Sequence, residues 1–397
     1  MSDAFSSRRT HRGPSRRLQT VQAPIIPAIA ALIRAHSGTI SLGQGMVHYL
    51  PPAQALARLQ RALADPHNHS YGHAQGLPLL KQAIARKLDV ENGIAVGDLD
   101  RIMITAGSNM GFHYAVLAIA DPGDEFILPT PYYFNHEMAV AMAGCKPVLV
   151  ATDADYHLQL ERIEAAITPR TRAIVTVSPN NPSGAVYSRS ALAGVNELCR
   201  AHGLYHISDE PYELFTWDDA RHFSPGALPK ADRHTISLFS FSKGAGLAGW
   251  RVGYTLLPES LVETFNKIQD TILICPSIAS QYAALGALEA DRGYYRENIQ
   301  AIGKVRQAVL GQLAALGGRI DPPRSEGAFY VLLRVHTKTR DMALVECLIS
   351  EFGVAVIPGS AFGVQDGCTL RIAYGALQKQ TVAEGIGRLV RGLKVLV

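Results

Sequence analysis

Lys243 lies in the stretch SLFSFSKGAGLAGWRVGY (residues 237–254), between two apolar runs that have the composition of buried strands. Small residues on both sides of the lysine leave room for a ligand to approach the backbone. A lysine in an apolar pocket loses its proton more easily and becomes a nucleophile that can form a Schiff base with a carbonyl. The alternative is a surface lysine, which most lysines are.

Arg251 follows Lys243 in the same glycine-rich stretch. A guanidinium group is suited to binding a phosphate. Ser240 and Ser242, directly before the lysine, add two hydroxyl donors. These residues together indicate a cofactor that carries both an aldehyde and a phosphate.

A second phosphate-binding element is the sequence TAGSNM (residues 105–110), at a predicted strand-to-helix turn. The backbone N–H groups of Gly107, Ser108 and Asn109 would open a helix there. Helix N-termini bind anions through their unpaired donors and the helix dipole. Ordinary N-capping by Ser108 is the alternative interpretation.

Asp209 follows an apolar run that reads as a strand. A carboxylate can keep a pyridine nitrogen protonated, so that the ring accepts electrons. Tyr212, one helical turn later, and Asn181 could donate hydrogen bonds to a ring oxygen. Asp209 could instead cap a helix, and Asn181 could be a turn residue before Pro182.

Apolar runs of strand length alternate with helical patterns from about residue 100. This alternation predicts an α/β fold with a mostly parallel sheet that is covered by helices on both faces. Ligands bind at the carboxyl ends of strands in such sheets. The predicted strands are Arg101–Thr105, Glu125–Leu128, Pro147–Ala151, Ala173–Val177, Leu204–Ser208, Thr235–Phe239 and Val252–Leu256.

The pattern changes after about residue 285, where a long helical stretch (282–316) leads to shorter strand-like runs at 328–335, 354–357 and 369–373. We therefore expect a smaller α+β domain at 286–397, after a large domain at 46–285. Residues 21–45 would join the small domain. Residues 1–20 read as a disordered basic tail, with a transit peptide as the alternative.

The overall composition narrows the class of protein. The chain has 397 residues, is 47% hydrophobic and carries a formal charge of only +4, which does not indicate a nucleic-acid partner. It has no apolar run of membrane-spanning length. The five cysteines are widely spaced, so we expect free thiols in a reducing, cytoplasmic compartment. His67, His69 and His73 have spacing that a metal could use, but we predict no metal site there.

The motifs taken together resemble the fold-type I aminotransferases that use pyridoxal 5'-phosphate, the class I and II group. The resemblance covers about residues 38–390. It rests on NNPSG (180–184), SDEPY (208–212), SFSK (240–243), GWRVG (249–253) and LRI (370–372). It implies the fold-type I architecture of a seven-stranded, mostly parallel sheet between helices, with a smaller α+β domain, and a homodimer with shared active sites.

The resemblance also implies a role for each matching residue. Lys243 would hold the cofactor as an aldimine and then move the proton of the substrate Cα. Asp209 would pair with the pyridine nitrogen, and Tyr212 and Asn181 would bond the ring 3-oxygen. The phosphate would be held by Ser108, Asn109, Ser240, Ser242 and Arg251.

Further roles are implied around the edge of this site. Tyr133, or Tyr132 in its place, would stack on the pyridine ring, and His136 would partner Asp209. Tyr71, in the sequence SYGHAQG (70–76), would reach across a dimer interface to the neighbour's phosphate. Arg371 would clamp the substrate carboxylate, with Asn181 beside it, and Gly45 would close over the substrate. The residues after Gly45, Met46-Val-His-Tyr, depart from the family, which usually has a proline there.

We therefore expect an aminotransferase that passes an amino group from an L-amino acid to a 2-oxo acid. No second cation occurs at the Ser108–Asn109–Met110 turn, which favours a neutral, aromatic or aliphatic donor. One alternative is a C–S lyase or another eliminating enzyme on the same fold. The other is a non-catalytic regulatory protein that binds pyridoxal phosphate.

Overall fold

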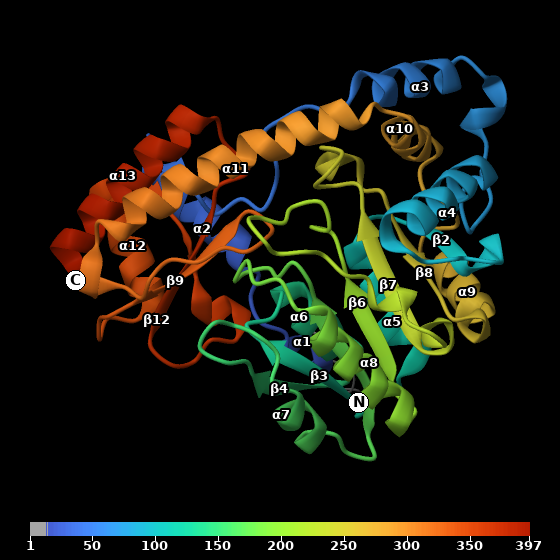
Figure 1. The fold of residues 1–397 in the computed structure, drawn as a ribbon, viewed down its shortest axis with the longest axis horizontal. Coiled ribbons are helices and arrows are strands. Elements are labelled where there is room, and N and C mark those ends of the chain that lie inside the picture. The colour runs from blue at the N-terminus through green and yellow to red at the C-terminus, as the bar shows by residue number, and fades with distance from the viewer. Residues whose placement is uncertain (1–12, 14) are drawn as a thin grey trace, which may run out of the picture.

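The computed structural model describes residues 13 and 15–397 of the protein. These residues form a large part built on a seven-stranded sheet and a small part built on a three-stranded sheet (Figure 1). The long helix α11 (Arg292–Ala314) runs from one part to the other. Most of the predicted basic tail lies outside the described residues, and Arg16–Gln19 at its end form the short helix α1.

The large part is organised by its central sheet, whose predicted, mostly parallel character is confirmed. Only β8 runs antiparallel to its neighbours, β2 and β7. Each predicted strand is present within one or two residues of its expected ends. In spatial order the strands are β2 (Ile102–Thr105), β8 (Gly253–Leu256), β7 (Thr235–Ser240), β6 (Tyr205–Asp209), β5 (Thr171–Val177), β3 (Glu125–Thr130) and β4 (Lys146–Ala151).

Helices cover both faces of this sheet. Side chains alternate along a strand, so Ala173 and Val175 of β5 pack in the core beneath α5, α6 and α9, while Ile174 between them packs beneath α7 and α8. Helices α3, α4 and α10 pack with β2 and β8. The bounds are α3 (Ala53–Leu63), α4 (Pro78–Asn92), α5 (Ser108–Ile119), α6 (Phe134–Met142), α7 (Leu160–Ala165), α8 (Arg189–His202), α9 (Val262–Ile272) and α10 (Ile278–Leu288).

Local sequence signals set the ends of these helices. Ser188 caps α8 by accepting a hydrogen bond from the backbone N–H of Ala191, and Gly203 ends the helix in the left-handed conformation. Gly93 ends α4 in the same way. These ends orient the connections that lead to the strands.

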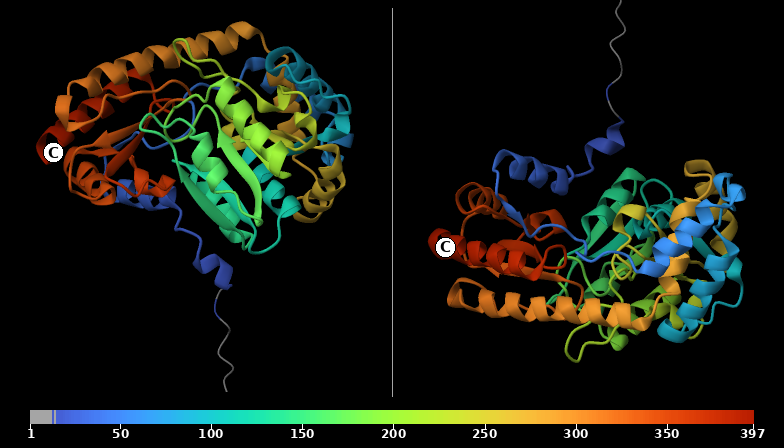
Figure 2. Two further views of the ribbon diagram at one scale, coloured as in Figure 1. Left: turned by 60° about the horizontal axis from the view of Figure 1, so that its bottom comes forward. Right: turned by 90° about the horizontal axis from the view of Figure 1, so that it is seen from above.

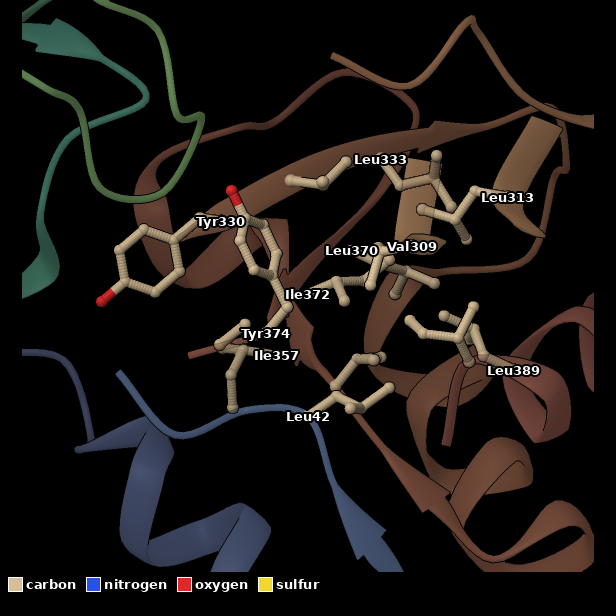
Figure 3. Packing of buried hydrophobic residues seen from close by; sticks show 14 of the residues in the cluster. Leu42, Val309, Leu313, Tyr330, Leu333, Ile357, Leu370, Ile372, Tyr374 and Leu389 are labelled. Carbon is tan, nitrogen blue, oxygen red and sulfur yellow. The ribbon is translucent and has the colours of Figure 1, made fainter. Parts of the chain in front are cut away.

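The small part packs an antiparallel sheet of β11 (Ile357–Pro358), β12 (Cys368–Ala373) and β9 (Tyr330–Val335) against α2 (Ile25–Ala35), α11, α12 (Asp341–Phe352) and α13 (Lys379–Leu396). The short strand β1 (Ile40–Ser41) pairs with β10 (Val354–Ala355). Figure 3 shows Leu42 among Leu370, Ile372 and Leu389, and Figure 2 shows α2 beside the small part. These contacts support the proposal that residues 21–45 join the small domain.

Two elements of the small part differ from the sequence-based expectation. The helix expected over 282–316 is interrupted between α10 and α11, because Asp291 caps the backbone N–H of Gly293 and starts a new helix. The run 354–357 divides into β10 and β11, which pair with different strands. None of the helices in the described part of the chain is both long and apolar enough to cross a membrane.

Candidate active site

The candidate active site lies at the carboxyl edge of the central sheet. β5, β6 and β7 run parallel, so the residues that follow them meet at one edge. A cavity opens there, and its wall contains most of the residues expected from the sequence. They are Ser108, Asn109, Tyr133, Asn181, Asp209, Tyr212, Ser240, Ser242, Lys243 and Arg251, joined by Val177 and Pro211.

Lys243 projects into this cavity from the loop after β7. Its Nζ donates to the carbonyl oxygen of Gly45 and lies 5.8 Å from the centre of the Tyr212 ring. Burial, with the nearby cations Arg371 and Arg251, lowers the pKa of Lys243 from 10.5 to about 8. More of the amine is therefore neutral near physiological pH than in an ordinary lysine, and a nucleophile requires the neutral form.

Asp209, the last residue of β6, has a buried carboxylate, and one of its oxygens has no hydrogen-bond partner among the described residues. It is 3% exposed. Its Oδ2 lies 3.1 Å from Nε2 of His136, whose ring stacks on Phe112 at 3.9 Å between centroids. Its Oδ1 has no hydrogen-bond partner in the described part of the chain. A buried carboxylate oxygen without a partner is costly, and a protonated ring nitrogen would satisfy it.

Tyr212 and Asn181 approach each other beside Asp209. Nδ2 of Asn181 donates to the Tyr212 hydroxyl at 3.4 Å, and the hydroxyls of Tyr212 and Tyr330 are 2.7 Å apart. Burial raises the pKa of Tyr212 well above its usual value, so the phenol keeps its proton. Both residues can therefore donate to an acceptor in the cavity.

The anion-binding end of the cavity is formed by the start of α5 and by Arg251. Gly107 precedes α5 with a φ of 84°, and a Cβ there would lie 2.5 Å from Nη2 of Arg251. Only glycine allows this approach of the guanidinium to the helix N-terminus. Arg251 forms no ion pair with a carboxylate among the described residues; it donates to the carbonyl oxygen of Ala248 at 2.9 Å. The helix N-terminus and the arginine together fit a phosphate.

The choice between the two neighbouring tyrosines is clear from their surroundings. Tyr133 lines the cavity and meets His136 edge-on at 5.2 Å between ring centroids. Tyr132 packs instead against Gly363 in the small part, where a Cβ on the glycine would lie 2.3 Å from its ring. The geometry therefore favours Tyr133 as the stacking residue.

Arg371 approaches the site from β12 of the small part. It is only 2% exposed. Its Nη1 donates to Oδ1 of Asn181 at 3.0 Å and its Nη2 to the carbonyl oxygen of Gly43 at 2.6 Å, while Nε has no partner in the described residues. The guanidinium also lies 4.9 Å from the centre of the Tyr330 ring. Such a buried, planar cation is suited to a carboxylate.

Gly45 and Tyr71 occupy different surroundings. Gly45 lies next to Lys243, and a Cβ there would be 2.5 Å from the Tyr330 hydroxyl. Tyr71 is absent from the cavity wall and is 82% exposed. An exposed position is compatible with contact to a second subunit, which is the role implied by the resemblance.

Two tyrosines of the site were missed in the sequence. Tyr330 bonds Tyr212 and lies over Arg371, although it comes from β9 of the small part. Tyr49 donates to the carbonyl oxygens of Lys243 and Gly244. Tyr330 lies in a run that reads only as a buried strand, and Tyr49 lies in the segment that departs from the family. Neither carries a local signal of chemistry.

The residues present fit pyridoxal phosphate. The cavity offers an anion site at the start of α5, an unpartnered buried oxygen on Asp209 and an amine of lowered pKa on Lys243. A phosphate, a pyridine nitrogen and an aldehyde need these three features. We find no cluster of three or more metal-binding side chains in the described part of the chain.

Comparisons with known proteins agree with this fit. A family model described as aminotransferase class I and II matches residues 37–389. The aromatic aminotransferase ISS1 of Arabidopsis thaliana is 34% identical over 395 residues, covering 96% of this chain and 97% of its own. The probable aspartate/prephenate aminotransferase of Aquifex aeolicus is 33% identical, covering 99% of this chain and 100% of its own.

Solved structures give the same result. A single mutant of the aspartate aminotransferase of Thermus thermophilus has a TM-score of 0.89 at 32% identity, covering 96% of this chain and 100% of its own. The aromatic aminotransferase of Pyrococcus horikoshii has a TM-score of 0.85 at 34% identity, covering 93% of this chain and 99% of its own.

Proposed function

Because this chain belongs to the aminotransferase class I and II family and is an enzyme that depends on pyridoxal phosphate, we propose how its own residues carry out transamination and on which substrates. The proposal rests on one observation. Lys243, with a lowered pKa, shares one cavity with Asp209 and with the anion site of Arg251.

Each residue of the cofactor side has a separate task in this proposal. When bound, pyridoxal phosphate supplies an aldehyde for amines and a ring that takes up electrons. Lys243 would bind the aldehyde carbon covalently, and its amine would take up the proton of the substrate Cα. Asp209 keeps the ring nitrogen protonated, and Tyr212 and Asn181 donate to the ring oxygen. Arg251 and the start of α5 bind the phosphate.

Arg371 and the loop at Gly45 form the substrate side. Arg371 binds the carboxylate that every amino acid and 2-oxo acid carries, and its planar guanidinium orients the Cα toward Lys243. The loop Gly45–Tyr49 and the small domain close over the substrate and exclude water. Exclusion of water protects the reacting groups from side reactions.

We propose a neutral, aromatic or aliphatic amino donor, with 2-oxoglutarate or pyruvate as acceptor. Lys243 and Arg251 are the cations in the cavity wall, and both have tasks in the reaction. A dicarboxylate donor would need another cation for its side chain, and 2-oxoglutarate as acceptor would need the same, so this argument favours pyruvate of the two acceptors. The relatives that match this chain include proteins named as aromatic and as aspartate aminotransferases, so the donor has to be measured.

We also propose a homodimer with shared active sites. Tyr71 is 82% exposed, and Leu50, Ile272 and Ile274 are exposed apolar side chains. Burial of such residues against a second copy would favour association, and it would bring Tyr71 to the neighbouring cavity.

The five cysteines are free thiols, which supports a reducing, cytoplasmic location.

The visible spectrum of the purified protein tests the reaction. The twenty amino acids are added one at a time, and the band of the bound cofactor is followed. Transamination requires that some amino acids convert the band to that of the amine form and that a 2-oxo acid restores it. Release of ammonia in place of this exchange would identify an eliminating enzyme instead.

A further inference from the structure

The segment Met46-Val-His-Tyr, which departs from the family pattern, lies directly against the loop that carries Lys243. The Tyr49 hydroxyl donates to the carbonyl oxygens of Lys243 and Gly244, at 3.0 and 3.1 Å. The Tyr49 ring is half-buried against the core of the small part. Burial raises the pKa of Tyr49, so its hydroxyl keeps the proton it donates.

The backbones of the two segments are also in close contact. Gly246 has a φ of 66°, and a Cβ there would lie 3.1 Å from the carbonyl oxygen of Tyr49 and 3.4 Å from backbone atoms of Leu50 and Pro51. Glycine is therefore needed both for the turn and for the approach. The Lys243 loop and residues 49–51 form one packed unit.

Two other hydrogen bonds hold residues 43–45 to the site, and both use groups that the proposed reaction needs. Nζ of Lys243 donates to the carbonyl oxygen of Gly45, and Nη2 of Arg371 donates to that of Gly43. When Lys243 is covalently attached and Arg371 binds a carboxylate, these donors are redirected. Within the described residues the Tyr49 hydroxyl bonds main-chain carbonyls alone, so its contact remains.

The two ends of the segment 48–50 are attached to neighbouring elements. Nδ1 of His48 donates to the carbonyl oxygen of Gly375 at 3.2 Å, next to β12 that carries Arg371. The Tyr294 hydroxyl donates to the carbonyl oxygen of Leu50 at 2.6 Å, at the start of α11. Tyr49 thus stands between the lysine loop and the small part.

We propose that Tyr49 is a positioning residue, whose hydroxyl keeps the Tyr49 end of loop 43–50 on the Lys243 loop while the Gly45 end closes over the substrate. This inference rests on the proposed roles of Lys243 and Arg371. With Tyr49 in place, residues 43–45 can exchange their bonds to Lys243 and Arg371 for ligand contacts while residue 49 keeps its position. Tyr49 therefore acts on the binding of amino and 2-oxo acids rather than on the attachment of the cofactor.

The test is Tyr49→Phe in the holoenzyme, which removes the hydroxyl and keeps the ring. The expected result is a rise in KM of about fivefold to tenfold for both the amino acid and the 2-oxo acid, as for the loss of one useful hydrogen bond. The expected kcat stays within about twofold, because the groups that react are unchanged. The visible band of the bound cofactor should remain.

Tyr295→Phe is the matched control, because the Tyr295 hydroxyl also donates to a main-chain carbonyl, that of Ala287 on α10. It should leave both KM values unchanged. A second readout is hydrogen exchange of the peptide 43–51, which should be faster in Tyr49→Phe than in the wild type, with and without cofactor. This measurement does not depend on activity.

Unchanged KM values in Tyr49→Phe would overturn the inference, as would equal increases in both variants, which would indicate a general loss of stability. Unaltered exchange of peptide 43–51 would also overturn it. Failure of the proposed function gives a different result, since the wild-type protein would then release ammonia from amino acids and show no KM for a 2-oxo acid.

Discussion

The cofactor side and the substrate side of the site differ in how their polar groups are satisfied. On the cofactor side, Oδ1 of Asp209 has no partner and Arg251 has no carboxylate beside it, within the described residues. On the substrate side, Arg371 donates to Oδ1 of Asn181 and to the carbonyl oxygen of Gly43, while its Nε has no partner among the described residues. Asp209 therefore offers a buried oxygen without a partner to a resident ligand, whereas Arg371 must exchange existing hydrogen bonds when a substrate enters.

This difference follows from the elements that carry the residues. Asp209 ends strand β6 and the Lys243 loop follows strand β7, in the middle of the large sheet, whose core fixes their positions. Arg371 comes from β12 of the small part and meets a loop. A cofactor that stays bound gains from a fixed site, while substrates that come and go need a site that can rearrange.

Lys243→Ala should have the largest effect and should break the cofactor side alone. Without the amine, no covalent attachment and no transfer of the Cα proton are possible, so turnover should fall by about 10⁴-fold or more, as for other covalent catalysts. The visible band of attached cofactor should disappear while the circular dichroism spectrum is unchanged. A variant that keeps this band would remove Lys243 from the proposed role.

Arg371→Ala should act on the substrate side with a smaller effect. The lost charge-assisted hydrogen bonds should lower kcat/KM by about 100-fold for every donor, mainly through KM. Cofactor retention should be nearly unchanged, as measured by the visible band after dialysis. Arg334→Ala is a control. Arg334 lies on β9, which pairs with the strand of Arg371, but its guanidinium forms an ion pair with Asp321 at 2.9 Å. Normal kinetics in Arg371→Ala would contradict the carboxylate clamp.

The pKa of Lys243 depends on cations from both sides of the site, and the pH dependence of cofactor uptake measures it. Burial and the cations Arg371 and Arg251 lower this pKa to about 8, and only the neutral amine attacks an aldehyde. The rate of pyridoxal phosphate uptake by the cofactor-free protein should therefore rise about tenfold per pH unit below pH 8 and level off above it. In Arg371→Ala the midpoint should move to higher pH. A midpoint near 10.5 in the wild type would contradict the lowered pKa.

Tyr330→Phe should have the smallest effect, at the boundary between the two sides. The substitution removes the hydroxyl that lies 2.7 Å from that of Tyr212, which should lower the free energy of unfolding by about 1 kcal/mol. Urea denaturation measures this change. We expect kcat/KM to fall by only about threefold, a factor that corresponds to less than 1 kcal/mol. A fall of a hundredfold or more would place Tyr330 in contact with the substrate.

Much of the cofactor side was predictable because its residues occupy short stretches of sequence. Asp209 and Tyr212 are one turn apart, and Lys243 and Arg251 share one glycine-rich run. Each of these two stretches lies at the end of an apolar run that predicts a strand. Parallel strands bring their carboxyl ends to one edge of the sheet. The seven-stranded sheet was predictable for the same reason. The break between α10 and α11 could not be predicted, because one aspartate at a helix start is a weak local signal.

The sequence by itself determined the class of fold, the type of cofactor and the residues at the strand ends, since these depend on local patterns and short spacings. Only the tertiary structure placed Tyr133 in the cavity wall and Tyr132 against Gly363. It also placed Tyr330 on Tyr212 and brought Tyr49 to the backbone of Lys243. Residue 330 is 118 positions from residue 212, and residue 49 is 194 positions from residue 243. Such contacts arise from the packing of whole domains, which no short stretch of sequence specifies.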